Sequence, residues 1–68
     1  MKSIGYKIKE RRIALNLTQK ELSKLTGIGQ STISEWEKDT YEPTANSIKL
    51  LCISLDISAD NLLDIKRD

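Results

Sequence analysis

Polar side chains at helical spacing between residues 30 and 38 are the groups in this chain best suited to recognition chemistry. At about 100° per residue, one arc of a helix there carries only hydrogen-bonding groups, namely Gln30, Ser31, Ser34, Glu35 and Lys38. The opposite side carries Ile33, Trp36 and Glu37 and is mainly apolar. Because short polar side chains allow close approach, such a face fits the major groove of a nucleic-acid duplex.

Another short helix is expected directly before this one. Thr18 can accept a hydrogen bond from a free backbone N–H, and Glu21, three residues later, can reach back to the Thr18 amide. This capping box predicts a helix that begins after Thr18 and continues to about Thr26. Gly27 follows at a position that favours a left-handed backbone, which glycine adopts at little cost.

The connection between these two helices is short. Ile28 is apolar, so we expect its side chain to fill the angle between the helices. Gly29 is an acceptable N-cap for the second helix, which is predicted to run from Gln30 to about Lys38. Two short helices with this offset and a glycine-bearing turn are typical of a helix-turn-helix motif over residues 18–38.

The motif resembles the helix-turn-helix of the phage repressor/Cro-type family, also called the XRE family. The shared residues are Thr18, Gln19, Leu22, Gly27, Ile28, the run from Gln30 to Ser34, Trp36 and Glu37. Pro43, the pattern from Ile48 to Leu55 and the pair Ile57–Ser58 extend the similarity over nearly the whole chain. The resemblance implies an all-α fold, a compact five-helix lambda-repressor-like domain spanning residues 1–68.

The resemblance also implies a function. The expected protein is a sequence-specific transcriptional regulator, a repressor that binds double-stranded DNA as a homodimer on a short palindromic operator. Phosphate contacts are expected from Thr18, Gln19 and Lys20, where the helix N-terminus favours anions. Base contacts are expected from Gln30, Ser31, Thr32, Ser34 and Glu35. Contacts to the DNA backbone on the far side are expected from Lys38 and from the main chain around Thr40 and Tyr41.

Two of these side chains suggest particular bases. Gln30 is the best candidate for a bidentate contact with adenine, and Glu35 can accept from a cytosine amino group. Glu35 departs from the family, which often has a basic or amide residue there. In the family, the residues that match Arg12 and Glu37 form an inward ion pair. Glu37 lies on the core side of its helix, where an unpaired carboxylate would be costly, so both residues are expected to be structural.

Size and composition limit the possible folds and cofactors. With 68 residues the chain is one domain near the lower limit for a self-supporting core. It has one cysteine and no histidine, which excludes an intramolecular disulfide and zinc sites built from several Cys and His. We therefore expect no metal and no cofactor, and helix packing must stabilise the fold.

Charge is unevenly distributed along the chain. The net charge is only +1, which by itself argues against a nucleic-acid partner. Residues 1–20, however, hold six basic side chains against the single acid Glu10. The basic residues are Lys2, Lys7, Lys9, Arg11, Arg12 and Lys20. This pattern predicts a basic end that attracts phosphates.

The flanking segments are predicted to form three further helices. The first begins after Ser3 and runs to about Leu15, with an apolar stripe of Ile4, Ile8 and Leu15. Asn16 follows at a position that suits a left-handed C-cap. The resemblance implies a left-handed backbone at Asp39, which stands where the family usually has glycine. The fourth helix is predicted to open at Pro43–Thr44 and to bury Ile48, Leu51, Cys52 and Leu55. The fifth helix is capped by Ser58, runs to about Asp64 and closes the core with Leu62 or Leu63.

Large aliphatic side chains on outer helix faces suggest a protein contact. Leu50 and Ile53 lie about 140–160° from the core stripe of their helix. With Ile57, Leu63 and Ile65 they form the predicted dimer interface. Tyr6 and Ile13 on the first helix are a rival outward pair.

Other function classes find less support. There is no histidine for a catalytic pair, no glycine-rich phosphate loop and no cluster of carboxylates, so no enzymatic activity is expected. No small-molecule ligand is evident. No apolar run approaches the ~20 residues that span a bilayer, which predicts a cytoplasmic protein. The alternative is a protein-interaction module, such as the antitoxin of a toxin–antitoxin pair.

Overall fold

A computed structural model describes residues 3–63 of the chain. All regular secondary structure in this range is helical, and the helices are α1 (Ile4–Ala14), α2 (Gln19–Thr26), α3 (Gln30–Glu37), α4 (Ala45–Leu55) and α5 (Ala59–Leu62). The predicted all-α, five-helix architecture is confirmed, with α2 and α3 forming the helix-turn-helix.

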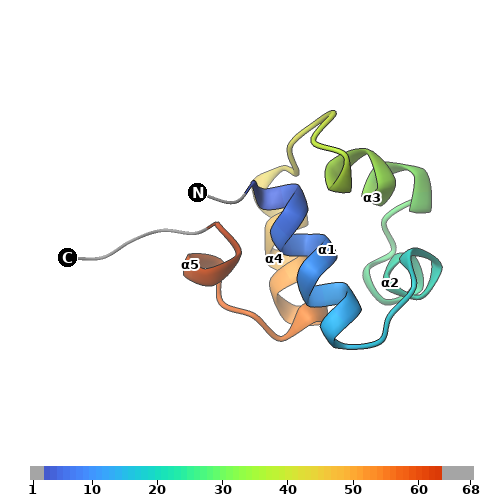
Figure 1. Cartoon of the computed structure of the whole chain (residues 1–68), viewed down its shortest axis with the longest axis horizontal. Coiled ribbons are helices and arrows are strands. Elements are labelled where there is room, and N and C mark those ends of the chain that lie inside the picture. The colour runs from blue at the N-terminus through green and yellow to red at the C-terminus, as the bar shows by residue number, and fades with distance from the viewer. Residues whose placement is uncertain (1–2, 64–68) are drawn as a thin grey trace.

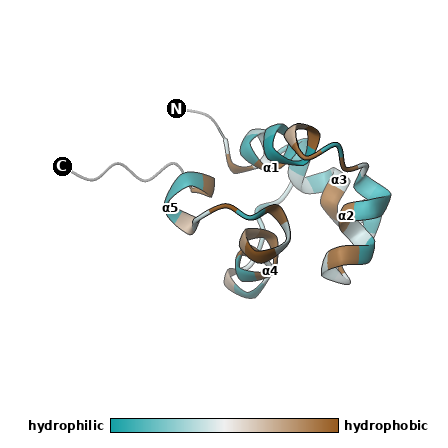
Figure 2. Cartoon of the chain, turned by 90° about the horizontal axis from the view of Figure 1, so that it is seen from below, coloured by the Kyte–Doolittle hydropathy of each residue, from teal (hydrophilic) through white to brown (hydrophobic). Residues whose placement is uncertain are grey.

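The helices surround one small core. Figure 1 shows α1 crossing in front of α4, with α2 and α3 on one side and α5 on the other. The perpendicular view in Figure 2 shows α1 and α4 as the two middle elements, and much of α4 is hydrophobic. Each helix contributes to the buried apolar core, which consists of Ile8, Leu22, Ile33, Trp36, Leu51, Leu55 and Leu62.

The helix ends follow the predicted capping residues. The hydroxyls of Ser3, Thr44 and Ser58 accept from the backbone N–H three residues later. Asn16 and Asp39 adopt positive φ angles of 58° and 61°. These short polar residues tolerate the left-handed region better than most non-glycine residues, so the chain can leave α1 and α3 by sharp turns.

One detail of the core differs from the prediction, and the structure decides another that the sequence left open. Leu15 is the C-cap of α1 and is 37% exposed, so it does not extend the stripe of Ile4 and Ile8. The reason is that α1 ends at Ala14 and the chain turns, after which Leu17 packs against the core instead. Of the two candidates on α5, Leu62 is fully buried. The helix ends there, and Asp64 lies outside the described residues.

A glycine on α1 allows this helix to approach α3 closely. A Cβ atom placed on Gly5 would lie 2.0 Å from the carbonyl oxygen of Trp36 and 2.6 Å from Oδ1 of Asp39. Next to it, the Ser3 hydroxyl donates to Oδ2 of Asp39 at 3.0 Å. The start of α1 is thus held directly against the end of α3.

Candidate nucleic-acid interface

The N-terminus of α2 is fixed by the predicted capping box. The Thr18 hydroxyl accepts from the Glu21 amide at 3.0 Å, and the Thr18 amide donates to Oε1 of Glu21 at 3.0 Å. The hydrogen bond that the Thr18 amide donates to the Glu21 carboxylate is the main cause that lowers the pKa of this carboxyl. The cap fixes where the chain enters α2, and thereby where Gln19 and Lys20 begin the helix.

The turn between α2 and α3 is held by side chains that the sequence did not single out. Gly27 has a φ of 76°, as predicted, and Ile28 packs against the core. In addition, the Ser23 hydroxyl donates to the carbonyl of Ile28, and the Thr26 hydroxyl accepts from the Ile28 amide. Both hydroxyls therefore tie α2 to the turn and fix the angle at which α3 leaves it.

The recognition helix α3 has the two faces that its sequence predicts. Ile33 is fully buried and Trp36 is 5% exposed on the inner side. On the outer side Gln30, Ser31 and Lys38 are exposed, whereas Ser34, Glu35 and Thr32 are half-buried. A shallow hollow of about 390 Å³ is lined by Gln19, Gln30, Ser31 and Ser34. Residues from both motif helices thus meet on one outward surface.

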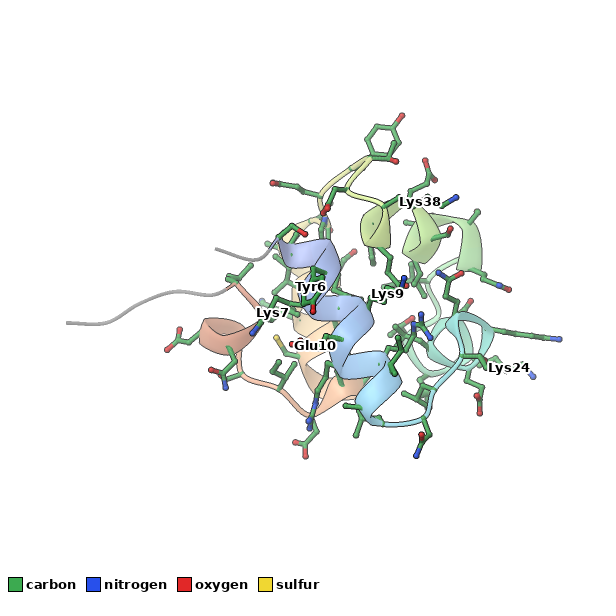
Figure 3. The ribbon with its side chains drawn as sticks, in the orientation of Figure 1. Tyr6, Lys7, Lys9, Glu10, Lys24 and Lys38 are labelled. Atoms are coloured by element: carbon green, nitrogen blue, oxygen red, sulfur yellow. The ribbon has the colours of Figure 1, made fainter. Side chains whose placement is uncertain are left out.

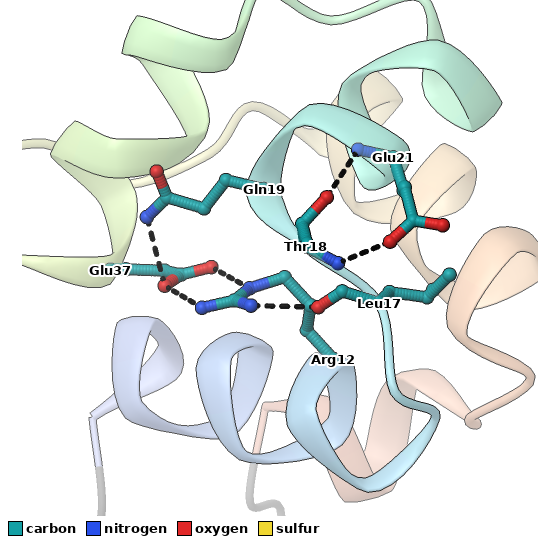
Figure 4. Close-up of polar contacts among 6 residues, drawn as sticks. All are labelled: Arg12, Leu17, Thr18, Gln19, Glu21 and Glu37. Carbon is teal, nitrogen blue, oxygen red and sulfur yellow. Dashed lines mark hydrogen bonds and ion pairs between the residues drawn. The ribbon is translucent and has the colours of Figure 1, made fainter.

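Arg12 and Glu37 form the expected ion pair beneath this surface (Figure 4). Nε and Nη2 of Arg12 donate to the two carboxylate oxygens at 2.8 and 2.9 Å, and Nη1 donates to the carbonyl of Leu17 at 2.8 Å. The two side chains are only 12% and 4% exposed. The hydrogen bond to Glu37 is the main cause that raises the pKa of the Arg12 guanidinium.

Gln19 links the ion pair to the outer surface. Its Nε2 donates to Oε1 of Glu37 at 3.2 Å, which braces α2 against α3. An amide nitrogen carries two hydrogens, so the same group has a second donor to offer. Gln19 also lines the hollow, together with Gln30 and Ser34. The structure thus shows Gln19 bracing the two motif helices, and its phosphate contact stays a prediction.

Beyond α3, the residues expected to contact the DNA backbone lie together in one loop. Lys38 is the C-cap of α3, and Thr40 and Tyr41 follow as exposed residues. The Thr40 amide already donates to the carbonyl of Glu35 at 2.9 Å. If this loop meets phosphates, it therefore does so through other groups, such as the Thr40 hydroxyl and the Lys38 ammonium.

The basic residues of the N-terminal segment serve different purposes. Arg12 forms its ion pair with Glu37 and is not available to DNA. Arg11 donates from Nε to the carbonyl of Leu55 at 2.7 Å and from Nη2 to the carbonyl of Asp56 at 3.1 Å. Figure 3 shows Lys7 and Lys9 on opposite sides of α1. The predicted basic end is thus divided, and Lys2 lies outside the described residues.

Other kinds of site are not evident in residues 3–63. No group of three or more His, Cys, Asp or Glu side chains in this range is arranged to hold a metal ion, and none of the five helices is long and apolar enough to span a bilayer. Cys52 packs against the core, as predicted, and burial raises the pKa of its thiol.

Comparison with known proteins agrees with this geometry. Residues 8–62 match the HTH_3 helix-turn-helix family. The chain is 35% identical over 60 residues to repressor protein C2 of Salmonella phage P22, a match that covers 88% of this chain and 28% of that protein. It is 33% identical over 61 residues to the HTH-type transcriptional regulator ImmR of Bacillus subtilis, over 90% of this chain and 48% of that protein. The chain thus spans less than half the length of these relatives.

Solved structures extend the comparison. The P22 c2 repressor in complex with a synthetic operator superposes with a TM-score of 0.89 and 32% identity, over 97% of this chain and 100% of that one. The restriction-modification controller protein C.AhdI of Aeromonas hydrophila superposes with a TM-score of 0.84 and 28% identity, over 88% and 91% of the two chains. The chain therefore belongs to the helix-turn-helix family of phage repressor/Cro type that its motif resembles.

Proposed function

We propose that this protein binds double-stranded DNA sequence-specifically and represses transcription. The observation that carries the proposal is the polar outer face of α3, which the Arg12–Glu37 pair and the capped α2 hold in a fixed orientation. The similar P22 c2 repressor was solved on a synthetic operator, which supports the same use of this surface. The proposed role involves no catalytic step and would be carried out in the cytoplasm.

The proposed contacts divide into two classes. Gln30, Ser31 and Ser34 line the hollow on α3, and with Thr32 and Glu35 they would face base edges. Thr18, Gln19 and Lys20 at the N-terminus of α2 would contact phosphates on one side of the groove. Lys38, Thr40 and Tyr41 would do so on the other side. Arg12 and Glu37 lie beneath and would set the orientation without touching DNA.

Selection of bound sequences from a random DNA pool tests the proposal directly. The expected result is enrichment of one short near-palindrome, with an affinity that falls steeply as salt rises. Failure to enrich any sequence, together with no salt-dependent retention on heparin, would refute DNA binding. That outcome would favour the protein-interaction class, such as an antitoxin.

Replacement of Gln30 is the most specific test of the outer face of α3. Gln30→Ala removes exposed polar atoms and no core atom, so folding should be unchanged. We expect loss of about 1–3 kcal/mol in binding to the selected operator and little change on a scrambled duplex. Competition between the two duplexes measures this difference. An equal loss on both would place Gln30 among the phosphate contacts.

We further propose that the protein acts as a homodimer through the outer face of α4. Leu50 and Ile53 are 42% and 79% exposed, and Leu63, the C-cap of α5, is 37% exposed. Ile57 packs partly against the core and so offers less surface, and Ile65 lies outside the described residues. Two-fold pairing would set two recognition helices about 34 Å apart, one turn of DNA, which matches a palindromic operator.

Sedimentation at micromolar concentration tests the dimer. The parent protein is expected to be dimeric, and Leu50→Glu with Ile53→Lys is expected to be monomeric, because the two new charges would be buried in the interface. Ile13→Glu on the rival face of α1 is the matched control and should stay dimeric. A parent that remains monomeric at high micromolar concentration, with and without DNA, would refute the dimer.

A further inference from the structure

Asp39 lies directly after the recognition helix, where the chain turns sharply against the end of α3. Its φ angle is 61° and its amide donates to the carbonyl of Trp36 at 3.0 Å. The Thr40 amide donates to the carbonyl of Glu35 at 2.9 Å. A left-handed residue between these two hydrogen bonds is the Schellman ending of an α-helix. The main chain of Asp39 and Thr40 is therefore fixed on α3.

The side chain of Asp39 is directed at the start of α1. Its Oδ2 accepts from the Ser3 hydroxyl at 3.0 Å, and its Oδ1 would lie 2.6 Å from a Cβ atom on Gly5, so a residue without a side chain leaves room for it. Figure 1 shows the start of α1 beside the segment that joins α3 to α4. Asp39 stands between Lys38 and Thr40, and a carboxylate that faced DNA with them would repel phosphate. The contact with α1 keeps this carboxylate away from such a position.

The start of α1 is a favourable place for a negative charge. The first turn of α1 contains no acidic side chain of its own, although a helix N-terminus favours anions. The Ser3 hydroxyl accepts from the Tyr6 amide at 3.1 Å while it donates to Asp39. One hydroxyl therefore caps α1 and also holds the loop that follows α3.

From this geometry we infer that the Ser3–Asp39 hydrogen bond keeps the loop after α3 in the form that contacts phosphate. The groups that it places would be the Thr40 hydroxyl and the Tyr41 amide, and this amide has no hydrogen-bond acceptor among residues 3–63. Ser3 and Asp39 are positioning residues, which act on DNA through the loop and do not touch it. The inference rests on the proposed DNA binding.

Ser3→Asp separates the loop from the cap. Aspartate caps a helix as well as serine does, so α1 should be kept and the urea midpoint should change little. The new carboxylate cannot donate to Asp39 and repels it. We expect roughly tenfold weaker binding to the selected operator for each recognition helix, because a hydrogen bond to a charged phosphate is lost. Ser3→Gly also lacks the donor and costs little as an N-cap, so it is a second variant for the same measurement.

A double variant with the net charge of the parent should restore binding. In Ser3→Asp with Asp39→Asn, the new amide can donate to the new carboxylate, and asparagine tolerates a left-handed backbone. Ser3→Asp with Glu42→Gln is the matched control. It has the same net charge and removes an exposed acid of the same loop, but it leaves the carboxylate of Asp39 opposed. This control should bind as weakly as Ser3→Asp alone.

Neutral phosphate replacements show which contact is lost. Single phosphates of the selected operator are replaced in turn by methylphosphonates, which carry no charge. For the parent we expect two groups of sensitive phosphates in each half-site, and Lys20→Ala should remove the effect of the group that α2 contacts. Ser3→Asp should remove the effect of the other group only. A variant that merely contained less folded protein would keep the effect of both groups.

The outcomes separate this inference from the proposed function. Absence of parent binding to any selected sequence refutes DNA binding itself. Normal parent binding, with Ser3→Asp and Ser3→Gly at the affinity of the parent, overturns the positioning role. The role is also overturned if the parent shows only the phosphates that α2 contacts, or if the second group keeps its effect in Ser3→Asp. Restoration by Asp39→Asn that is no better than restoration by Glu42→Gln overturns it as well.

Discussion

Two neighbouring arginines connect α1 to the two halves of the molecule. Arg12 points to the helix-turn-helix half, where it binds the carboxylate of Glu37 and the carbonyl of Leu17. Arg11 points to the α4–α5 half, where it binds the carbonyls of Leu55 and Asp56 at the end of α4. One half carries the proposed DNA contacts and the other the proposed dimer surface, so α1 holds both in register.

The partners of the two arginines differ in kind. Glu37 is a nearly buried full charge, and among residues 3–63 its carboxylate accepts hydrogen bonds from Arg12 and Gln19, which offset its desolvation. The carbonyls at the end of α4 are neutral groups with partial negative charge, and the Asp56 residue is exposed to water. Adjacent residues of the same type can therefore have very different effects on stability, depending on which groups are left without a partner when each is removed.

The largest effect is expected from Arg12→Met. The free energy of unfolding should fall by about 3–5 kcal/mol, because the Glu37 carboxylate stays buried without its cation. Urea denaturation of the parent and the variant measures this loss. A urea midpoint equal to that of the parent would mean that the ion pair contributes nothing to the free energy of unfolding.

A double variant distinguishes a lost charge partner from lost packing. Arg12→Met combined with Glu37→Leu should recover much of the stability, because no unpaired charge is left in the interior. Recovery should be incomplete, since the Leu17 carbonyl and the Gln19 amide still lose hydrogen-bond partners. If the double variant is less stable than either single one, the side chains act through their packing.

Gly5→Ala is expected to have the second largest effect, on the same half of the molecule. The new methyl group would lie too close to the Trp36 carbonyl, so α1 and α3 would have to separate, at a cost of about 1–3 kcal/mol. Gly29→Ala is a control for steric crowding, because the nearest atom to its Cβ would be the Thr32 hydroxyl at 3.8 Å; its expected cost comes from the weaker N-cap of α3 alone. Thermal unfolding of both variants is the measurement. If Gly5→Ala melts at the same temperature as the parent, α1 and α3 adjust to the added methyl group without loss of stability.

The sequence predicted the features that depend on local order. The capping box of Thr18 and Glu21 and the left-handed Gly27 follow from residues a few positions apart, and they are confirmed. The Arg12–Glu37 pair was implied by the family resemblance and is also present. The chain likewise predicts the outer face of α3, although its contacts with bases stay predictions.

The features that the sequence did not predict depend on how helices approach each other. Gly5 looks like an ordinary helix residue until α3 lies against it. Arg11 looks like a surface cation until the end of α4 comes within reach of its guanidinium. Leu15 fitted the apolar stripe by spacing, but the helix ended one residue earlier. In each case the deciding partner is distant in sequence or lies at a helix boundary.

The smallest effect is expected from Arg11→Ala, on the other half of the molecule. The variant loses two hydrogen bonds to carbonyls and a favourable charge at the end of α4, while water can replace part of the contact at Asp56. We expect a loss of about 1–1.5 kcal/mol in urea denaturation. Arg11→Lys should lie between the parent and Arg11→Ala, because an ammonium keeps the charge but lacks the planar fork that reaches two carbonyls together. Hydrogen exchange should locate the change at the end of α4 and leave α2 and α3 protected. A loss as large as that of Arg12→Met, or one that spreads into the helix-turn-helix, would show that the two halves depend on α1 in the same way.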